Sequence, residues 1–218
     1  MKVLIINPNT TKEMTRAIEE TSRANAASGT KITCVTASEG PEAIETAYDV
    51  AIAAFHVLGV IKEREADFDA FVIACGANPG LDAARVITRK PVAGIGESGM
   101  LTACAVAAKF SVIIPAVPRA CDAGWSAVRA LGLENRCASV RSTGKGVLGG
   151  FFIDRRELEE MLYMTGKPAV EQDGAGALML LCAGMTGTKE ILEKRLKVPV
   201  VDGVISALKA VEQFPGFG

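Results

Sequence analysis

Two cysteines at matching positions in the two halves of the chain are the residues best suited to chemistry. Cys75 ends the apolar run 71–74, Cys182 ends the run 178–181, and small residues follow each of them. They lie 107 residues apart in a chain of 218 residues. A thiolate can take a proton from carbon, and a thiol can return one. Two such groups on opposite faces of one carbon would invert it, so the pair predicts a racemase or epimerase.

Further matches between the two halves indicate an internal duplication. Pro91-Val-Ala-Gly94 corresponds to Pro199-Val-Val-Asp-Gly203, which starts 108 residues later. The apolar segments that end at Pro8 and Pro115 match at a similar offset. A duplicated fold with one thiol in each half would let the two thiols face each other across a cleft.

Short, continuous apolar runs predict eight strands that are buried on both faces of parallel sheets. These runs lie at 3–6, 32–36, 70–74, 92–95, 110–114, 137–141, 177–182 and 198–201. Helical patterns between them begin near Thr10, Pro41, Leu81, Glu97, Arg119, Asp154, Thr188 and Val204. Thr10-Thr-Lys-Glu13 has the form of a capping box, and the helix after Pro41 is expected to reach Glu65.

Eight alternating strand and helix units predict an α/β fold with right-handed parallel connections. Such units also build closed eight-stranded barrels. We favour two open four-stranded sheets, because the chain is short for a barrel and the repeat contains four units. Both cysteines then lie at carboxyl ends of strands, where open sheets bind ligands. The Gly-rich stretch 144–150 lies away from those ends and is either a surface loop or a lid.

Composition narrows the possible partners to a small molecule. The net charge is −1 and the pI about 6.0, so no nucleic-acid or membrane-surface partner is expected. No apolar run approaches the roughly 18 residues of a membrane span, and the cytoplasm is the expected location. Six cysteines in such a protein predict free thiols. With His56 as the single histidine and no C-x-x-C pair, neither a metal site nor another cofactor is expected.

Small residues around the two cysteines leave backbone N–H groups free to contact a substrate. The predicted substrate-binding residues are Asn9, Gly76, Ala77, Asn78, Ala183 and Gly184. A helix N-terminus after each cysteine would favour its thiolate. The other four cysteines are interpreted as small core residues, namely Cys34, Cys104, Cys121 and Cys137.

Three other polar or glycine-rich features have alternative interpretations. Residues 94–99 match the dinucleotide pattern G-x-G-x-x-G, but no acidic residue ends the next strand, which weakens a nucleotide site. Asp82 and Arg85 are interpreted as a surface pair on one helix face. Glu97 would either cap its own helix or reach the cleft.

Taken together, these segments resemble the aspartate/glutamate/hydantoin racemase superfamily, and within it the hydantoin and allantoin racemase branch. The resemblance covers nearly the whole chain. It rests on Ile6-Asn-Pro-Asn-Thr10, the segment from Cys75 to Arg85, Pro91-Val-Ala-Gly-Ile-Gly-Glu-Ser98, Ala138-Ser-Val-Arg141, Cys182-Ala-Gly-Met185 and Pro199-Val-Val-Asp-Gly203.

The resemblance implies two flavodoxin-like lobes related by a pseudo-two-fold duplication, with the site between them. The N-terminal lobe would comprise residues 1–97 plus 203–218, including a swapped C-terminal helix, and the second lobe residues 98–202. The resemblance also implies cofactor-independent racemisation by two cysteines, which fall on Cys75 and Cys182. It further implies that the protein forms a homo-oligomer.

Two segments depart from the pattern of that family. Gly76-Ala-Asn78 follows the first cysteine, where the hydantoin branch more often has a large apolar residue and then an Asp. Gly76 is therefore expected to leave extra room in the pocket. Pro115-Ala116 stands where the family tends to carry threonine hydroxyls that hold a substrate carbonyl.

The sequence thus predicts a metal-free racemase of a small cyclic ureide, such as a 5-substituted hydantoin or allantoin. One alternative keeps the fold and changes the reaction to decarboxylation or isomerisation of small dicarboxylates. Another alternative is a non-catalytic protein that binds a small molecule or a nucleotide.

Overall fold

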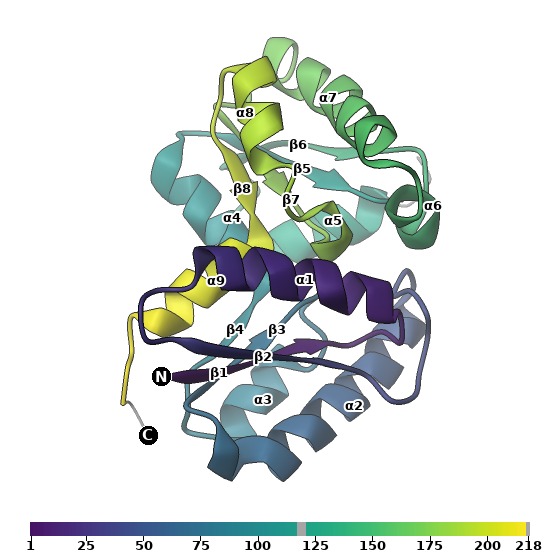
Figure 1. The fold of residues 1–218 in the computed structure, drawn as a ribbon. Coiled ribbons are helices and arrows are strands. Elements are labelled where there is room, and N and C mark those ends of the chain that lie inside the picture. The colour runs from purple at the N-terminus through teal and green to yellow at the C-terminus, as the bar shows by residue number, and fades with distance from the viewer. Residues whose placement is uncertain (117–120, 217–218) are drawn as a thin grey trace.

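The chain forms two similar halves, each built on a four-stranded parallel sheet with helices on both faces (Figure 1). The computed structural model describes residues 1–116 and 121–216. The first sheet has the order β2-β1-β3-β4 and the second the order β6-β5-β7-β8. This repeated order confirms the predicted α/β fold with two open sheets, and the alternative of a single closed barrel is wrong.

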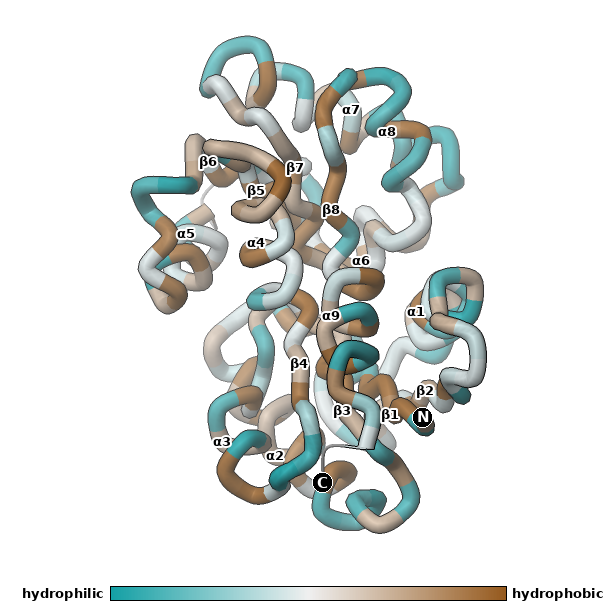
Figure 2. Tube along the Cα trace, turned by 90° about the vertical axis from the view of Figure 1, so that its left-hand side faces the viewer, coloured by the Kyte–Doolittle hydropathy of each residue, from teal (hydrophilic) through white to brown (hydrophobic). Residues whose placement is uncertain are grey.

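The strands coincide with the predicted apolar runs to within a few residues. In the first sheet they are β1 (Lys2–Asn7), β2 (Lys31–Thr36), β3 (Ala70–Ile73) and β4 (Val92–Gly94). In the second they are β5 (Phe110–Ile114), β6 (Cys137–Ser142), β7 (Ala177–Leu180) and β8 (Val200–Asp202). All residues of β3 and β7 are buried, as expected for central strands covered on both faces. Figure 2 shows the hydrophobic colour concentrated in the strands and the hydrophilic colour in outer turns.

Nine α-helices are described between and after these strands. They are α1 (Lys12–Asn25), α2 (Ala47–Arg64), α3 (Leu81–Ile87), α4 (Ile95–Val106), α5 (Cys121–Ala130), α6 (Val147–Phe151), α7 (Arg155–Glu171), α8 (Lys189–Leu196) and α9 (Gly203–Glu212). Short 3₁₀ turns follow at Glu65–Asp67 and Ala183–Met185. None of the described helices is long and apolar enough to cross a membrane. The predicted helix start at Arg119 lies outside the described residues.

The predicted helix start at Pro41 is wrong, because α2 begins six residues later. Thr46 caps this helix: its hydroxyl accepts the N–H of Asp49, and the Asp49 carboxylate accepts the N–H of Thr46 at 2.8 Å. This reciprocal capping box fixes the helix start at Ala47. Residues 41–46 therefore form a non-helical segment that precedes α2.

The predicted capping box at the start of α1 is also wrong. Thr11 occupies the N-cap position, but its side chain makes no capping bond. The Thr11 hydroxyl donates instead to the backbone carbonyl of Glu42 at 2.8 Å. The Thr11 side chain therefore contacts the segment before α2 and does not cap its own helix.

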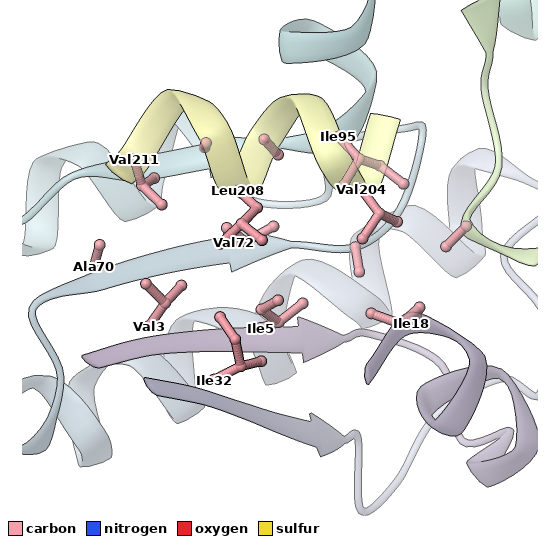
Figure 3. Packing of buried hydrophobic residues seen from close by; sticks show 14 of the residues in the cluster. Val3, Ile5, Ile18, Ile32, Ala70, Val72, Ile95, Val204, Leu208 and Val211 are labelled. Carbon is pink, nitrogen blue, oxygen red and sulfur yellow. The ribbon is translucent and has the colours of Figure 1, made fainter. Parts of the chain in front are cut away.

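Two helices pack against the sheet of the other half. Val204, Leu208 and Val211 of α9 lie against Val72 of β3 in the core of the first sheet (Figure 3). Met100 of α4 belongs to the core of the second sheet, although α4 follows β4 directly. From this packing we propose that the first lobe consists of residues 1–97 and 203–218, and the second of residues 98–202. Helix α9 then follows the second lobe in sequence but packs on the first, and most of α4 follows the first sheet but packs on the second.

Candidate active site

Cys75 and Cys182 line one cavity of about 330 Å³ at the carboxyl ends of the two sheets. Cys75 comes just after β3, and Cys182 just after β7. Both strands are central in their sheets, and ligands of open parallel sheets bind at this end. Both cysteines are partly exposed, which fits side chains that face an open cavity.

A backbone N–H two residues further along the chain serves each sulfur. The N–H of Gly184 donates to Cys182 Sγ at 3.4 Å, and the N–H of Ala77 acts on Cys75 in the same way. Both donors lower the pKa of their thiol. The two halves of the molecule thus repeat the thiol and also its supporting donor.

Burial nevertheless has the largest effect on the pKa of both thiols, and it raises both values. It raises the pKa of Cys75 to about 12, against the Ala77 N–H and with a smaller contribution from Cys182. It raises the pKa of Cys182 to about 11, with the charge of Glu45 adding to it. The expectation that helix N-termini favour thiolates is therefore not met in the free protein. These raised pKa values favour the protonated form of both thiols at neutral pH.

Asn9 lines the cavity from the first lobe, held by its neighbours in a fixed orientation. Its Oδ1 accepts from Asn7 Nδ2 at 2.9 Å and from the N–H of Thr11 at 3.0 Å. Its Nδ2 contacts Met14 Sδ at 3.2 Å, a weak acceptor. The amide nitrogen is therefore the group that Asn9 can offer to a substrate carbonyl.

Other predicted binding residues are divided between the cavity and its supports. Gly76, Ala77 and Ala183 line the cavity. Gly184 does not line it, and its N–H is engaged by the Cys182 sulfur. The extra room expected beside Gly76 does not exist, because Leu181 of the other lobe packs directly against it.

Asn78 lies outside the cavity and supports the start of α4. Its Oδ1 accepts the N–H of Gly96 at 2.9 Å and that of Glu97 at 3.4 Å. Side chains at Gly94 or Gly96 would collide with this amide, since an added Cβ would lie 2.2 and 2.9 Å from its atoms. The glycines of the dinucleotide-like pattern thus have a packing role here. Glu97 pairs with Arg85 at 2.5 Å and neither caps its helix nor reaches the cavity.

The mouth of the cavity consists of residues that were not among the predicted site residues. Ile44, Glu45 and Thr46 line it from the segment before α2, and Gly146 and Val147 line it from the start of α6. The first segment was not expected at the cavity, because the predicted helix start at Pro41 placed residues 44–46 within a helix. The second belongs to the Gly-rich stretch 144–150, which forms part of the site rather than a remote surface loop.

An apolar wall closes the cavity on the side of the second lobe. Pro115 and Ala116 stand where hydroxyl groups were expected from the family pattern, and small residues of α5 continue this wall. Its members are Ile114, Pro115, Ala116, Ala123, Gly124, Ala127 and Leu181. No Lys or Arg among the described residues lines the cavity.

The cavity with the two cysteines is separate from a second, larger groove. A larger groove of about 1130 Å³ lies along α3, α4 and α9 and contains neither Cys75 nor Cys182. The described residues contain no cluster of three His, Cys, Asp or Glu side chains that could hold a metal ion. Cys34 is part of β2, packs against the first core and does not line the cavity.

Comparisons with known proteins identify the family of this chain. The family model described as Asp/Glu/Hydantoin racemase matches residues 3–211. A hydantoin racemase of Pseudomonas sp. (strain NS671) is 43% identical over all of this chain and 87% of its own length. A hydantoin racemase of Paenarthrobacter aurescens is 38% identical, over all of this chain and 92% of its own length.

The solved structures include a similar fold with a similar sequence. Allantoin racemase from Klebsiella pneumoniae superimposes with a TM-score of 0.93 at 37% identity, and the match covers 98% of this chain and 86% of that one. Since the family model spans nearly the full length and the relatives exceed 30% identity, the chain belongs to the Asp/Glu/hydantoin racemase family.

Proposed function

We propose that this protein racemises a small cyclic ureide, a 5-substituted hydantoin or allantoin, with two cysteines and no cofactor. The supporting observation is the single cavity lined by Cys75 from one lobe and Cys182 from the other. The membership of the family and the hydantoin racemases among its relatives give the reaction class.

In this proposal the two sulfurs act on opposite faces of the C5 carbon. One thiol first releases its proton to water, and its thiolate then takes the C5 proton while the C5–H electron pair moves into the adjacent carbonyl. The other thiol then gives its proton to the opposite face. Asn9 Nδ2 and the loop N–H groups at Gly76 and Ala183 stabilise the enolate oxygen, while the N–H of Ala77 supports the Cys75 sulfur. In the reverse direction the two cysteines exchange roles.

Polarimetry of single enantiomers of 5-substituted hydantoins and of allantoin, under reducing conditions, tests this proposal. With the wild-type protein, the optical rotation of the substrate solution is expected to fall to zero. With Cys75→Ser or Cys182→Ser, the rotation is expected to stay unchanged. Cys34→Ser serves as the matched control, because Cys34 is a partly buried thiol outside the cavity. Full turnover by either serine variant at the cavity would refute the two-cysteine scheme. Arylmalonates should release no CO₂.

Two further parts of the proposal rest on sequence reasoning. We place the protein in the cytoplasm, because free thiols persist in a reducing compartment. We also propose that it assembles as a homo-oligomer, as the family resemblance implies.

A further inference from the structure

Glu45 is the one acidic side chain that lines the thiol cavity among the described residues. It belongs to the segment before α2, and it is exposed, so it stands at the mouth of the cavity. Its Oε1 accepts the backbone N–H of Val147 at 2.6 Å, a contact between residues 102 positions apart. The carboxylate is thus held where the first lobe meets α6 of the second lobe.

The neighbouring glycine permits this close approach. A Cβ added at Gly146 would lie 2.6 Å from Glu45 Oε1 and 3.3 Å from its Cδ. Any larger residue would push the carboxylate away from the Val147 N–H. Glu45 is therefore fixed in position by the backbone of the opposite lobe rather than free in solvent.

Among residues 1–116 and 121–216, the charge of Glu45 has no cationic partner. No Lys or Arg of the described chain approaches it within ion-pair distance, and Lys145, close to Val147 in sequence, pairs with Glu157 at 2.7 Å. The remaining lining residues are apolar or neutral apart from the two thiols. After burial, the Glu45 carboxylate also raises the pKa of Cys182, so its field reaches the reacting group.

We propose that Glu45 determines substrate charge: it excludes hydantoins with an anionic 5-substituent and admits neutral or cationic ones. This inference rests on the proposed racemase function. A negative substituent in this cavity would meet a like charge at the mouth, and no Lys or Arg among the described lining residues compensates it. Dicarboxylates, which carry two such charges, are excluded for the same reason.

A matched pair of substrates isolates this effect. 5-(2-Carboxyethyl)hydantoin and 5-(2-carbamoylethyl)hydantoin have nearly the same size and differ in charge. The wild-type protein should racemise the carbamoyl compound with a kcat/KM about 100-fold higher than the carboxyl compound. The 5-(4-aminobutyl) compound should be accepted as well. Glu45→Gln removes the charge and keeps an acceptor for Val147, and it should reduce the 100-fold ratio at least tenfold.

Glu42→Gln is the matched control, because it removes a negative charge three residues away that does not line the cavity. It should leave the substrate ratio at the wild-type value. Glu45→Asp keeps the charge and should keep most of the discrimination. An unchanged ratio in Glu45→Gln, or equal rates of wild type on both compounds, would overturn the inference.

A second measurement needs no variant. Raising the salt concentration from about 0.02 M to about 0.5 M screens charges near the surface, so the wild-type ratio should fall. A ratio that is independent of salt would count against Glu45 as its origin. If the wild-type protein racemises no hydantoin at all, the proposed function itself fails, whereas equal racemisation of both compounds refutes the role of Glu45 alone.

Discussion

Gly76 and Leu181 bring the two lobes into direct backbone contact between the two cavity cysteines. A Cβ added at Gly76 would lie 1.9 Å from the carbonyl oxygen of Leu181 and 2.8 Å from its Cγ. Each of these residues is the chain neighbour of one cysteine, Cys75 or Cys182. This contact, which only glycine allows, therefore holds together the two chain segments that carry the thiols.

Replacing this glycine should disturb folding and activity together. Gly76→Ala is expected to lower the free energy of unfolding by about 1–3 kcal/mol, because the lobes must shift to relieve the overlap. Racemisation should fall more than stability suggests, since the shift separates the two thiols. Denaturant unfolding and polarimetry measure the two effects. Gly59→Ala is the control: its added Cβ meets no atom within 4 Å, and α2 should gain up to about 1 kcal/mol.

Alkylation by iodoacetamide should report the raised pKa values of the cavity thiols. Only a thiolate reacts, so a pKa of about 11 for Cys182 makes the rate rise about tenfold per pH unit between pH 7 and 10. Cys75, with a pKa of about 12, should react more slowly at every pH in that range. Free cysteine, whose rate levels off above about pH 8.5, is the reference. Mass spectrometry of the labelled peptides identifies each site, and a plateau near neutral pH would contradict the burial argument.

Hydrogen exchange from solvent should separate the roles of the two cysteines. In D₂O, wild-type protein incorporates deuterium at C5 of both enantiomers while it racemises them. A variant with serine at one cavity cysteine keeps one base, so it should exchange the C5 proton of one enantiomer only. Cys75→Ser and Cys182→Ser should show opposite preferences, because their remaining sulfurs lie on opposite faces of the carbon. Proton NMR of the substrate follows the loss of the C5 signal. Equal exchange of both enantiomers by one variant would contradict this assignment.

Asn78 should prove to be a support of α4 and not a contact of the substrate. Asn78→Ala removes the acceptor of the Gly96 N–H and should cost about 1 kcal/mol of stability, as for the loss of a helix cap. Asn78→Asp keeps this acceptor, so it should preserve stability and the KM for hydantoin. A large rise of KM in Asn78→Asp would instead indicate direct substrate binding.

The sequence was sufficient to predict the two sheets and the presence of Cys75 and Cys182 at one cavity, whereas their catalytic role stays a prediction. Buried parallel strands are continuous apolar runs, and the internal repeat marks Cys75 and Cys182 as corresponding residues. The start of α2 was missed because Pro41 and Thr46 both favour a helix start, and the contacts of Thr46 with Asp49 decided between them. Local patterns also could not reveal that Glu45 meets Val147, since that contact depends on how the lobes approach.

The raised pKa values of the two thiols also could not be predicted from the residues next to them in sequence. Neighbouring N–H groups favour the thiolates of Cys75 and Cys182, and these donors are visible in the sequence as small residues. The opposing effect is burial, which accumulates from residues of both lobes around the cavity. Asn78 illustrates the same difficulty, because its neighbours at Gly94 and Gly96 come from the next strand and helix.

The exchange of α4 and α9 between the lobes has a consequence for synthesis on the ribosome. The first sheet is incomplete until residues 203–212 have emerged, because Val204, Leu208 and Val211 cover one of its faces. Until then Val72 and its neighbours stay open to solvent and to chaperones. A nascent chain that stops before its last helix therefore leaves the first half unfinished, even though the residues of the second core have all been made.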